Sequence, residues 1–153
     1  DALVVVAFGQ IIPEVLLNMP KYGGVNVHAS LLPRYRGAAP IHHAFFNGET
    51  KTGVTTMLMD PGLDTGPALL QEEVEICPDD NVGTLQARLA EVGRELLLKT
   101  LAGLEQGAVQ PRPQDDRLAT YAPSVKKEDC LLRWDTSSGG IVNRVRGCTP
   151  TPG

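Results

Sequence analysis

The side chains best suited to chemistry follow one another at the end of a short apolar run, where Asn26 and His28 are separated by one residue. On an extended strand alternate residues face the same way. The amide and the imidazole are therefore predicted on one face, roughly 6 to 7 Å apart. The chain then enters a loop that carries Arg34 and Arg36 and ends at Gly37. Open α/β sheets bind ligands at such strand ends, so we predict the active-site segment here.

An amide, an imidazole and a carboxylate are the groups needed to move an acyl group between two nitrogen atoms. The tetrahedral intermediate of such a transfer carries negative charge on oxygen, which an amide donor and an imidazolium stabilise. A carboxylate would orient the imidazole, favour its protonated form and assist proton movement. Asp60 and Asp64, in the turn-rich loop that follows the next predicted strand, are both candidates. The alternative is that the histidine completes a structural network and the aspartates only shape a turn.

A metal site is not expected. His42 and His43 are adjacent in a predicted helix, and neighbouring helical side chains diverge by about 100°, so the two imidazoles cannot easily share an ion. The sequence also lacks the glycine-rich phosphate-binding patterns and the Gly-x-Ser-x-Gly nucleophile pattern. The strand-end amide and imidazole therefore remain the main candidates for chemistry.

The elements that must position these groups begin with Ala2–Ala7, a continuous β-branched run typical of a parallel strand buried on both faces. A short helix begun by Pro13 would cross over to Gly24–His28, the predicted neighbouring strand. Nothing upstream supplies a second neighbour, and Asp1 comes directly before the first strand. We therefore expect an internal fragment in which preceding βα units are missing.

Downstream, the pattern predicts a helix over Pro40–Phe46, a strand over Thr52–Met59 and an acidic edge strand over Ala68–Ile76. The longest predicted helix runs from Val82 to Gln106, with an asparagine N-cap and a glycine stop. Its packed face is expected to consist of residues at helical spacing: Leu85, Leu89, Val92 and Leu96.

Three units are predicted along the chain: a catalytic α/β domain over residues 1–110, a proline-broken linker over 111–120, and a short C-terminal unit over 121–153. In the last unit we expect a strand at Leu131–Trp134 and a helix at Ser138–Arg146. About 30 residues bury little core, so this unit is expected to be the start of a larger domain.

Composition is ordinary for a soluble globular protein: 153 residues, 42% hydrophobic and 21% charged, with no apolar run long enough to span a membrane. Cys77, Cys130 and Cys148 are odd in number and widely spaced, so we interpret them as unpaired thiols in a reducing compartment. The net charge is −4, yet residues 121–153 hold five Lys and Arg against three Asp and Glu. Either a nucleic-acid partner or a chance imbalance explains this tail.

The run VNVHASLLPRYRGAAPI, followed by TGVTTMLMDPGLDTGP, closely resembles the 10-formyltetrahydrofolate-dependent formyltransferases, and among them the members that formylate methionyl-tRNA. The resemblance implies that Asn26, His28 and Asp64 are catalytic, and so selects Asp64 over Asp60. It also implies a formyltransferase-type Rossmann-like sheet followed by the start of a small β-rich C-terminal domain. The segments YAPSVKKED and LLRWD are similar to the beginning of that domain.

The same resemblance implies a folate site and tRNA contacts. The tRNA contacts are assigned to Arg34 and Arg36. The folate-binding residues it assigns lie on three segments: Ser30, Leu31, Leu32 and Pro33; Phe8, Gly9 and Ile11; Pro61, Gly62 and Leu63.

The function that the resemblance implies is transfer of a formyl group from 10-formyltetrahydrofolate to the α-amino group of methionyl-initiator tRNA, for translation initiation and without a metal. The expected setting is a monomer in the cytoplasm with no membrane partner, and an organellar matrix stays open. The alternatives are a formyltransferase acting on a sugar or nucleotide amine, a 10-formyltetrahydrofolate hydrolase, or a non-catalytic truncated fragment.

Overall fold

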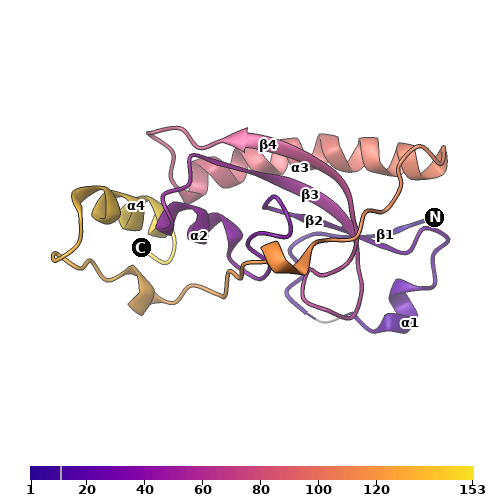
Figure 1. The fold of residues 1–153 in the computed structure, drawn as a ribbon, viewed down its shortest axis with the longest axis horizontal. Coiled ribbons are helices and arrows are strands. Elements are labelled where there is room, and N and C mark those ends of the chain that lie inside the picture. Colours follow the sequence, from indigo (N-terminus) through magenta and orange to yellow (C-terminus); the bar gives the residue numbers. More distant parts are fainter. Residues whose placement is uncertain (11) are drawn as a thin grey trace.

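The computed structural model describes residues 1–10 and 12–153, and its strands form one sheet in the order β1-β2-β3-β4 (Figure 1). The strands are β1 (Leu3–Val5), β2 (Gly24–His28), β3 (Lys51–Leu58) and β4 (Ala68–Glu75). β1 runs parallel to β2, whereas β2 with β3 and β3 with β4 are antiparallel. The predicted parallel pairing of the first two strands and the edge position of the acidic strand are confirmed.

The first strand is less buried than its sequence predicts. Val5 is buried, but Val4 is 41% exposed and Val6, just after the strand, is 57% exposed. The prediction of burial on both faces is wrong in this structure, because β1 lies at the edge of the sheet and pairs only with β2.

The helices are α1 (Glu14–Leu17), α2 (Pro40–Phe46), α3 (Val82–Glu105) and α4 (Ser138–Cys148), with 3-10 turns at Asp116–Leu118 and Lys127–Cys130. The long helix α3 lies along β3 and β4 (Figure 1). Its predicted boundaries hold because Asn81 and Thr84 form a reciprocal capping box at its start, while Gly107 adopts a φ of 68° just after its end. No helix in the described residues combines the length and the apolar character of a membrane-crossing segment.

The core lies between α3 and the sheet, and α2 closes one end of it. The predicted packed face of α3 is confirmed, since Leu85, Leu89 and Leu96 are buried with Val54 of β3 and Phe45 of α2. Apolar burial of this kind supplies most of the driving force that holds a helix on a sheet. The core thus fixes the sheet whose strand ends carry the candidate site.

The C-terminal segment packs on the rest of the chain through α4. The guanidinium of Arg144 lies 4.2 Å from the ring centre of Phe46 in α2. The strand predicted over Leu131–Trp134 is wrong, because residues 131–133 have no regular secondary structure and Trp134, which is 79% exposed, begins a turn. No strand of the described residues pairs with it, so its β-forming residues have no ladder to join.

The interpretation of the cysteines as three free thiols is also wrong. Cys148 is the last residue of α4, and it forms a disulfide with Cys130 of the second 3-10 turn, with 5.9 Å between the Cα atoms. Only Cys77 is unpaired. The sequence separation of 18 residues carries no pairing signal, because the contact depends on the path of the chain between the 3-10 turn and α4.

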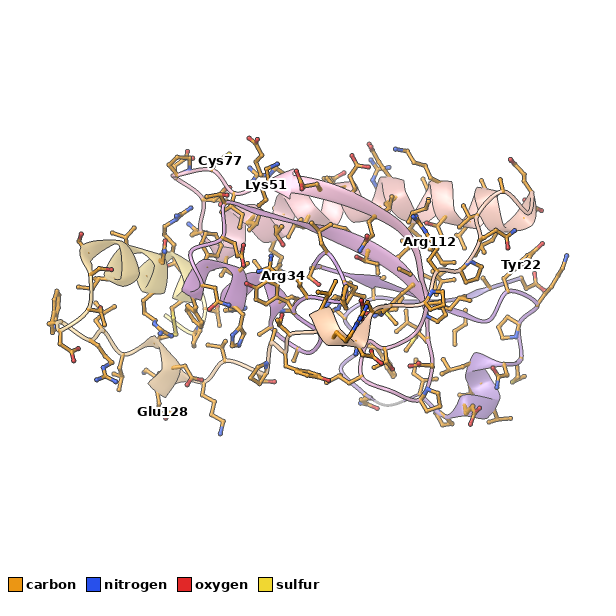
Figure 2. All side chains as sticks on the ribbon, in the orientation of Figure 1. Tyr22, Arg34, Lys51, Cys77, Arg112 and Glu128 are labelled. Atoms are coloured by element: carbon orange, nitrogen blue, oxygen red, sulfur yellow. A yellow bond between two sulfur atoms is a disulfide. The ribbon has the colours of Figure 1, made fainter. Side chains whose placement is uncertain are left out.

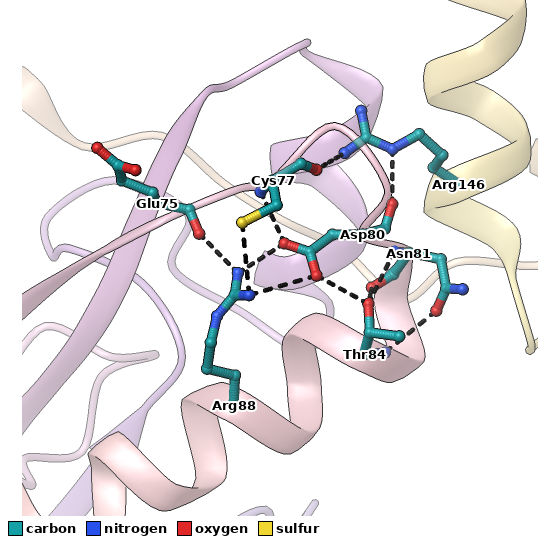
Figure 3. Close-up of polar contacts among 7 residues, drawn as sticks. All are labelled: Glu75, Cys77, Asp80, Asn81, Thr84, Arg88 and Arg146. Atoms are coloured by element: carbon teal, nitrogen blue, oxygen red, sulfur yellow. Dashed lines mark hydrogen bonds and ion pairs between the residues drawn. The ribbon is translucent and has the colours of Figure 1, made fainter.

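A polar cluster ties α4 to the loop between β4 and α3 (Figure 3). Arg146 donates to the carbonyl oxygens of Asp80 at 2.6 Å and Cys77 at 2.5 Å. The carboxylate of Asp80 accepts from the Arg88 guanidinium at 2.6 Å and from the Cys77 backbone N–H at 2.7 Å. Burial alone raises the pKa of Asp80, but hydrogen bonds from Arg88, Cys77 and Thr84 outweigh it and hold the pKa below its ordinary value.

Candidate active site

The strand β2 presents Asn26 and His28 on one face, as alternation predicts, and the loop between β3 and β4 brings Asp64 to them. The Asn26 amide nitrogen Nδ2 lies 3.5 Å from Asp64 Oδ1. The His28 ring nitrogen Nδ1 lies 3.6 Å from Asp64 Oδ2. The structure therefore gathers the three predicted catalytic side chains, although they come from sequence positions up to 38 residues apart.

The hydrogen bonds of His28 define which ring nitrogen can face a substrate. Nε2 lies 2.9 Å from the carbonyl oxygen of Tyr35, and a carbonyl only accepts, so Nε2 carries a hydrogen. Nδ1 faces the carboxylate of Asp64 at a distance too long for a direct hydrogen bond. The Nδ1 edge of this buried ring is thus the part left for a reacting oxygen.

Asp64 is held by the backbone on the opposite side of the site. Its Oδ2 accepts a 2.8 Å hydrogen bond from the N–H of Gly37. Its φ is 53°, in the left-handed region that few residues other than glycine, asparagine and aspartate occupy. Residues held in this region often cluster at functional sites, where the surroundings enforce the conformation.

Asp60 has a different place. Its Oδ1 accepts from the N–H of Gly62 at 3.0 Å and from the hydroxyl of Thr65 at 2.7 Å. These are the contacts of a turn-capping aspartate. The geometry therefore separates the two candidate carboxylates: Asp64 faces the imidazole and Asp60 shapes the loop.

The predicted folate segment after His28 is anchored by a threonine that the sequence did not single out. The hydroxyl of Thr55, on β3, donates to the Ser30 carbonyl at 2.7 Å and accepts from the Leu32 N–H at 3.1 Å. Gln71 of β4 adds a 2.8 Å bond to the Leu32 carbonyl. Ser30 and Leu32 are buried, whereas Leu31 and Pro33 are partly exposed. The two partly exposed residues are the ones available to a ligand.

The remaining predicted folate residues flank the site on exposed loops. Pro61, Gly62 and Leu63 are exposed and share the loop of Asp64. Phe8 and Gly9 are exposed and follow β1, whose end lies beside Asn26 in the register of the sheet. Ile11, the last predicted member, lies outside the described residues. The binding of folate by these residues stays a prediction.

Arg34 and Arg36, on the loop between β2 and α2, differ in their exposure to solvent. Arg34 is exposed, pairs with Glu49 and lies near the middle of the molecule on the loop between β2 and α2 (Figure 2). Arg36 is only 2% exposed, and its guanidinium is bonded to Gln114 and Asp116. The guanidinium of Arg36 is thus buried and paired within the chain, whereas that of Arg34 is accessible, and the tRNA contacts of both residues stay predictions.

Sequence reasoning missed Thr55 and Gln114. Thr55 stands inside an alternating strand, where threonine is common for its β propensity alone. Gln114 lies in the proline-broken stretch interpreted as a linker, where polar residues are ordinary. Among the described residues no group of three or more His, Cys, Asp or Glu side chains is placed to hold a metal ion, and the prediction that none is needed stays a prediction.

The fold is a mixed sheet that carries a buried imidazole beside a partly buried amide and carboxylate. The chain belongs to the formyl transferase family, whose family model matches residues 1–101. The predicted α/β formyltransferase fold is confirmed by this match.

The chain is 54% identical to the methionyl-tRNA formyltransferase of Citrifermentans bemidjiense over 100% of its own length and 48% of that protein. It is 56% identical to that of Geotalea uraniireducens, over 100% of its length and 49% of that protein. A crystal structure of the formyltransferase PseJ from Anoxybacillus kamchatkensis, in complex with UDP-4,6-dideoxy-4-formamido-L-AltNAc and tetrahydrofolate, matches with a TM-score of 0.76 and 26% identity, over 96% of this chain and 77% of that one. The chain thus spans about half the length of the curated relatives.

Proposed function

We propose that the gene product containing this chain transfers a formyl group from 10-formyltetrahydrofolate to the α-amino group of methionine esterified to initiator tRNA. The observation that carries the proposal is the Asn26, His28 and Asp64 cluster, set in a chain 54% identical over its whole length to a protein named for this activity. The product, formyl-methionyl-tRNA, would serve translation initiation.

The reaction begins when the lone pair of the α-amino nitrogen attacks the formyl carbon. A new C–N bond forms, and the carbonyl π electrons move onto oxygen. The tetrahedral intermediate collapses when the bond from carbon to the folate nitrogen breaks. That nitrogen gains a proton while the attacking nitrogen loses one, so protons balance without any other reactant.

The three side chains supply the charge and proton handling that this path requires. The Asn26 amide and the Nδ1–H of a protonated His28 donate to the developing oxyanion, because both lie on the same face of β2. The negative charge of Asp64 stabilises the imidazolium, and its carboxylate relays a proton from the attacking amine. Its tie to the Gly37 N–H keeps one carboxylate oxygen directed toward the ring.

The folate co-substrate would lie across the strand ends, between the Ser30–Pro33 segment and the loop that carries Pro61, Gly62 and Leu63. PseJ is described in complex with tetrahydrofolate, which supports a folate site in this fold. Phe8 and Gly9 would close the side nearest β1. Arg34, the exposed arginine of the loop, is the candidate for tRNA contact.

A sugar amine is the second candidate acceptor, because the PseJ structure contains a formamido sugar nucleotide. The deciding assay offers labelled 10-formyltetrahydrofolate to the full gene product with methionyl-tRNA, with an amino-sugar nucleotide, or with neither. Label on methionyl-tRNA alone is the expected result. Label on the sugar, or release of formate without an acceptor, would overturn the acceptor assignment.

The setting that fits this function is a monomeric protein in the cytoplasm. Gel filtration with light scattering of the full gene product tests the monomer directly.

A further inference from the structure

The stretch interpreted as a linker lies against both loops of the candidate site. At one end, Arg112 and Ala68 form a bridge with mutual N–H to carbonyl bonds of 2.8 and 2.9 Å. At the other end, the Arg36 N–H donates to Thr120 O at 2.8 Å, and Ala122 N–H donates to Arg36 O at 2.7 Å. Residues 112–122 therefore form a strap across the Asp64 loop and the loop that follows His28.

Gln114 is the point where this strap contacts both loops through one side chain. Its Nε2 donates to the carbonyl oxygens of Asp64 at 2.9 Å and Gly66 at 2.7 Å. Its Oε1 accepts from Arg36 Nε at 3.1 Å and Nη2 at 2.9 Å. All the polar atoms of the amide are thus engaged on opposite sides.

The orientation of this amide follows from chemistry. A guanidinium only donates and a carbonyl only accepts, so the amide oxygen must face Arg36 and the amide nitrogen must face the loop. Arg36 is 2% exposed, and besides the amide of Gln114 it pairs with the carboxylate of Asp116, at 2.8 Å. A buried arginine with fixed partners holds the glutamine in one orientation more firmly than a solvated one would.

The Asp64 loop needs such a restraint. Asp64 has a φ of 53°, a strained conformation that persists only when the surroundings impose it. The carboxylate end is held by the Gly37 N–H, and the main-chain end is held by Gln114. Together the two contacts determine where the carboxylate stands relative to His28.

We propose that Gln114, oriented by the buried Arg36, is a positioning residue for formyl transfer: it fixes the backbone of the Asp64 loop so that the carboxylate faces the His28 ring. The inference rests on the proposed function. It makes the strap part of the catalytic unit, and it assigns Arg36 an internal role in place of contact with a partner.

The test is a double-mutant cycle in the full gene product, with formyl transfer measured under saturating methionyl-tRNA. Gln114→Ala should lower kcat about 10- to 100-fold, the range expected when a catalytic group is misplaced by up to about 1 Å. KM for 10-formyltetrahydrofolate should change less than kcat does, since the Gln114 side chain bonds to the backbone at Asp64 and Gly66 and not at Ser30–Pro33 or at Pro61–Leu63. The matched control is Gln110→Ala, just before the strap: among the described residues its side chain bonds to Gly107 O alone, so its loss should leave kcat unchanged.

In the Asp64→Asn background, Gln114→Ala should change kcat by less than about twofold, because the group it positions is already lost. If the two losses multiply instead, Gln114 acts on general structure and the proposal is overturned. Gln114→Glu keeps an acceptor for Arg36 but cannot donate to the loop carbonyls, so it should lose kcat even if the alanine variant folds poorly. Wild-type kcat in Gln114→Glu would overturn the proposal.

The proposed function and the positioning role of Gln114 are refuted by different results. If the wild-type gene product transfers no formyl group, the proposed function fails. If wild type is active and both Gln114 variants match it, formyl transfer stands and the positioning role falls.

Discussion

Replacing Thr55 by valine probes how the sheet holds the predicted folate segment. Valine keeps the branched shape, so packing changes little, but the hydroxyl is lost from a fully buried position. The Ser30 carbonyl and the Leu32 N–H then each lose their one hydrogen-bond partner among the described residues. The Gln71 amide also loses its 2.9 Å bond to the Thr55 hydroxyl but keeps its bond to Leu32 O.

Two unpaired buried polar groups cost about 1 to 3 kcal/mol each, and partial relaxation brings the expected loss in unfolding free energy to about 2 to 4 kcal/mol. For a protein of 150 to 250 residues, such a loss lowers Tm by about 4 to 16 °C, and the shift is smaller in a longer chain. Calorimetry of the full gene product gives the stability change, and steady-state kinetics should show a higher KM for 10-formyltetrahydrofolate. The control Thr55→Ser keeps the hydroxyl and should lose only about 1 kcal/mol. A valine variant within about 0.5 kcal/mol of wild type, with an unchanged KM, would refute the reasoning.

Two further predictions concern stability. Because the pKa of Asp80 is held below its ordinary value of 3.8, its ionised form contributes stability that is present above about pH 4 and is lost as pH falls through the lowered value. Asp80→Asn should therefore flatten the acid limb of urea-unfolding free energy measured from pH 5 to pH 2, and an unchanged limb would contradict the Arg88 pairing. Gly53→Ala should destabilise by about 2 kcal/mol or more, since its Cβ would overlap a carbonyl of β4. The helical control Gly139→Ala, which meets no neighbour, should be neutral or up to about 1 kcal/mol stabilising by thermal melt; equal effects of the two would show that the β3–β4 contact is looser than the structure has it.

Local pattern was enough to predict most of the elements. The range Pro40–Phe46 and the strand Gly24–His28 agree with the structure at both ends, because proline starts, glycine stops and apolar spacing act within a few residues. Burial of the first strand and the strand at Leu131–Trp134 were wrong, since both depend on which neighbours the fold supplies. The disulfide was missed for the same reason.

The candidate site, too, was predictable only where local sequence pattern determines it. Alternation along β2 places Asn26 and His28 on one face without knowledge of the fold. The choice between Asp60 and Asp64 came from family resemblance, because sequence spacing does not reveal which carboxylate turns inward. The role of Gln114 could not be predicted from the sequence. It depends on contacts with Asp64 and Arg36, which lie 50 and 78 residues away in the sequence and meet Gln114 only in the folded chain.

The most direct test of the central claim is the rate of labelled formyl transfer to methionyl-tRNA by the full gene product carrying His28→Ala, with folding verified by circular dichroism. If the imidazole donates to the oxyanion, the variant should lose about 3 to 4 kcal/mol of transition-state stabilisation, a fall of roughly 100- to 1,000-fold in kcat. A folded variant that keeps activity within about tenfold of wild type would contradict the account.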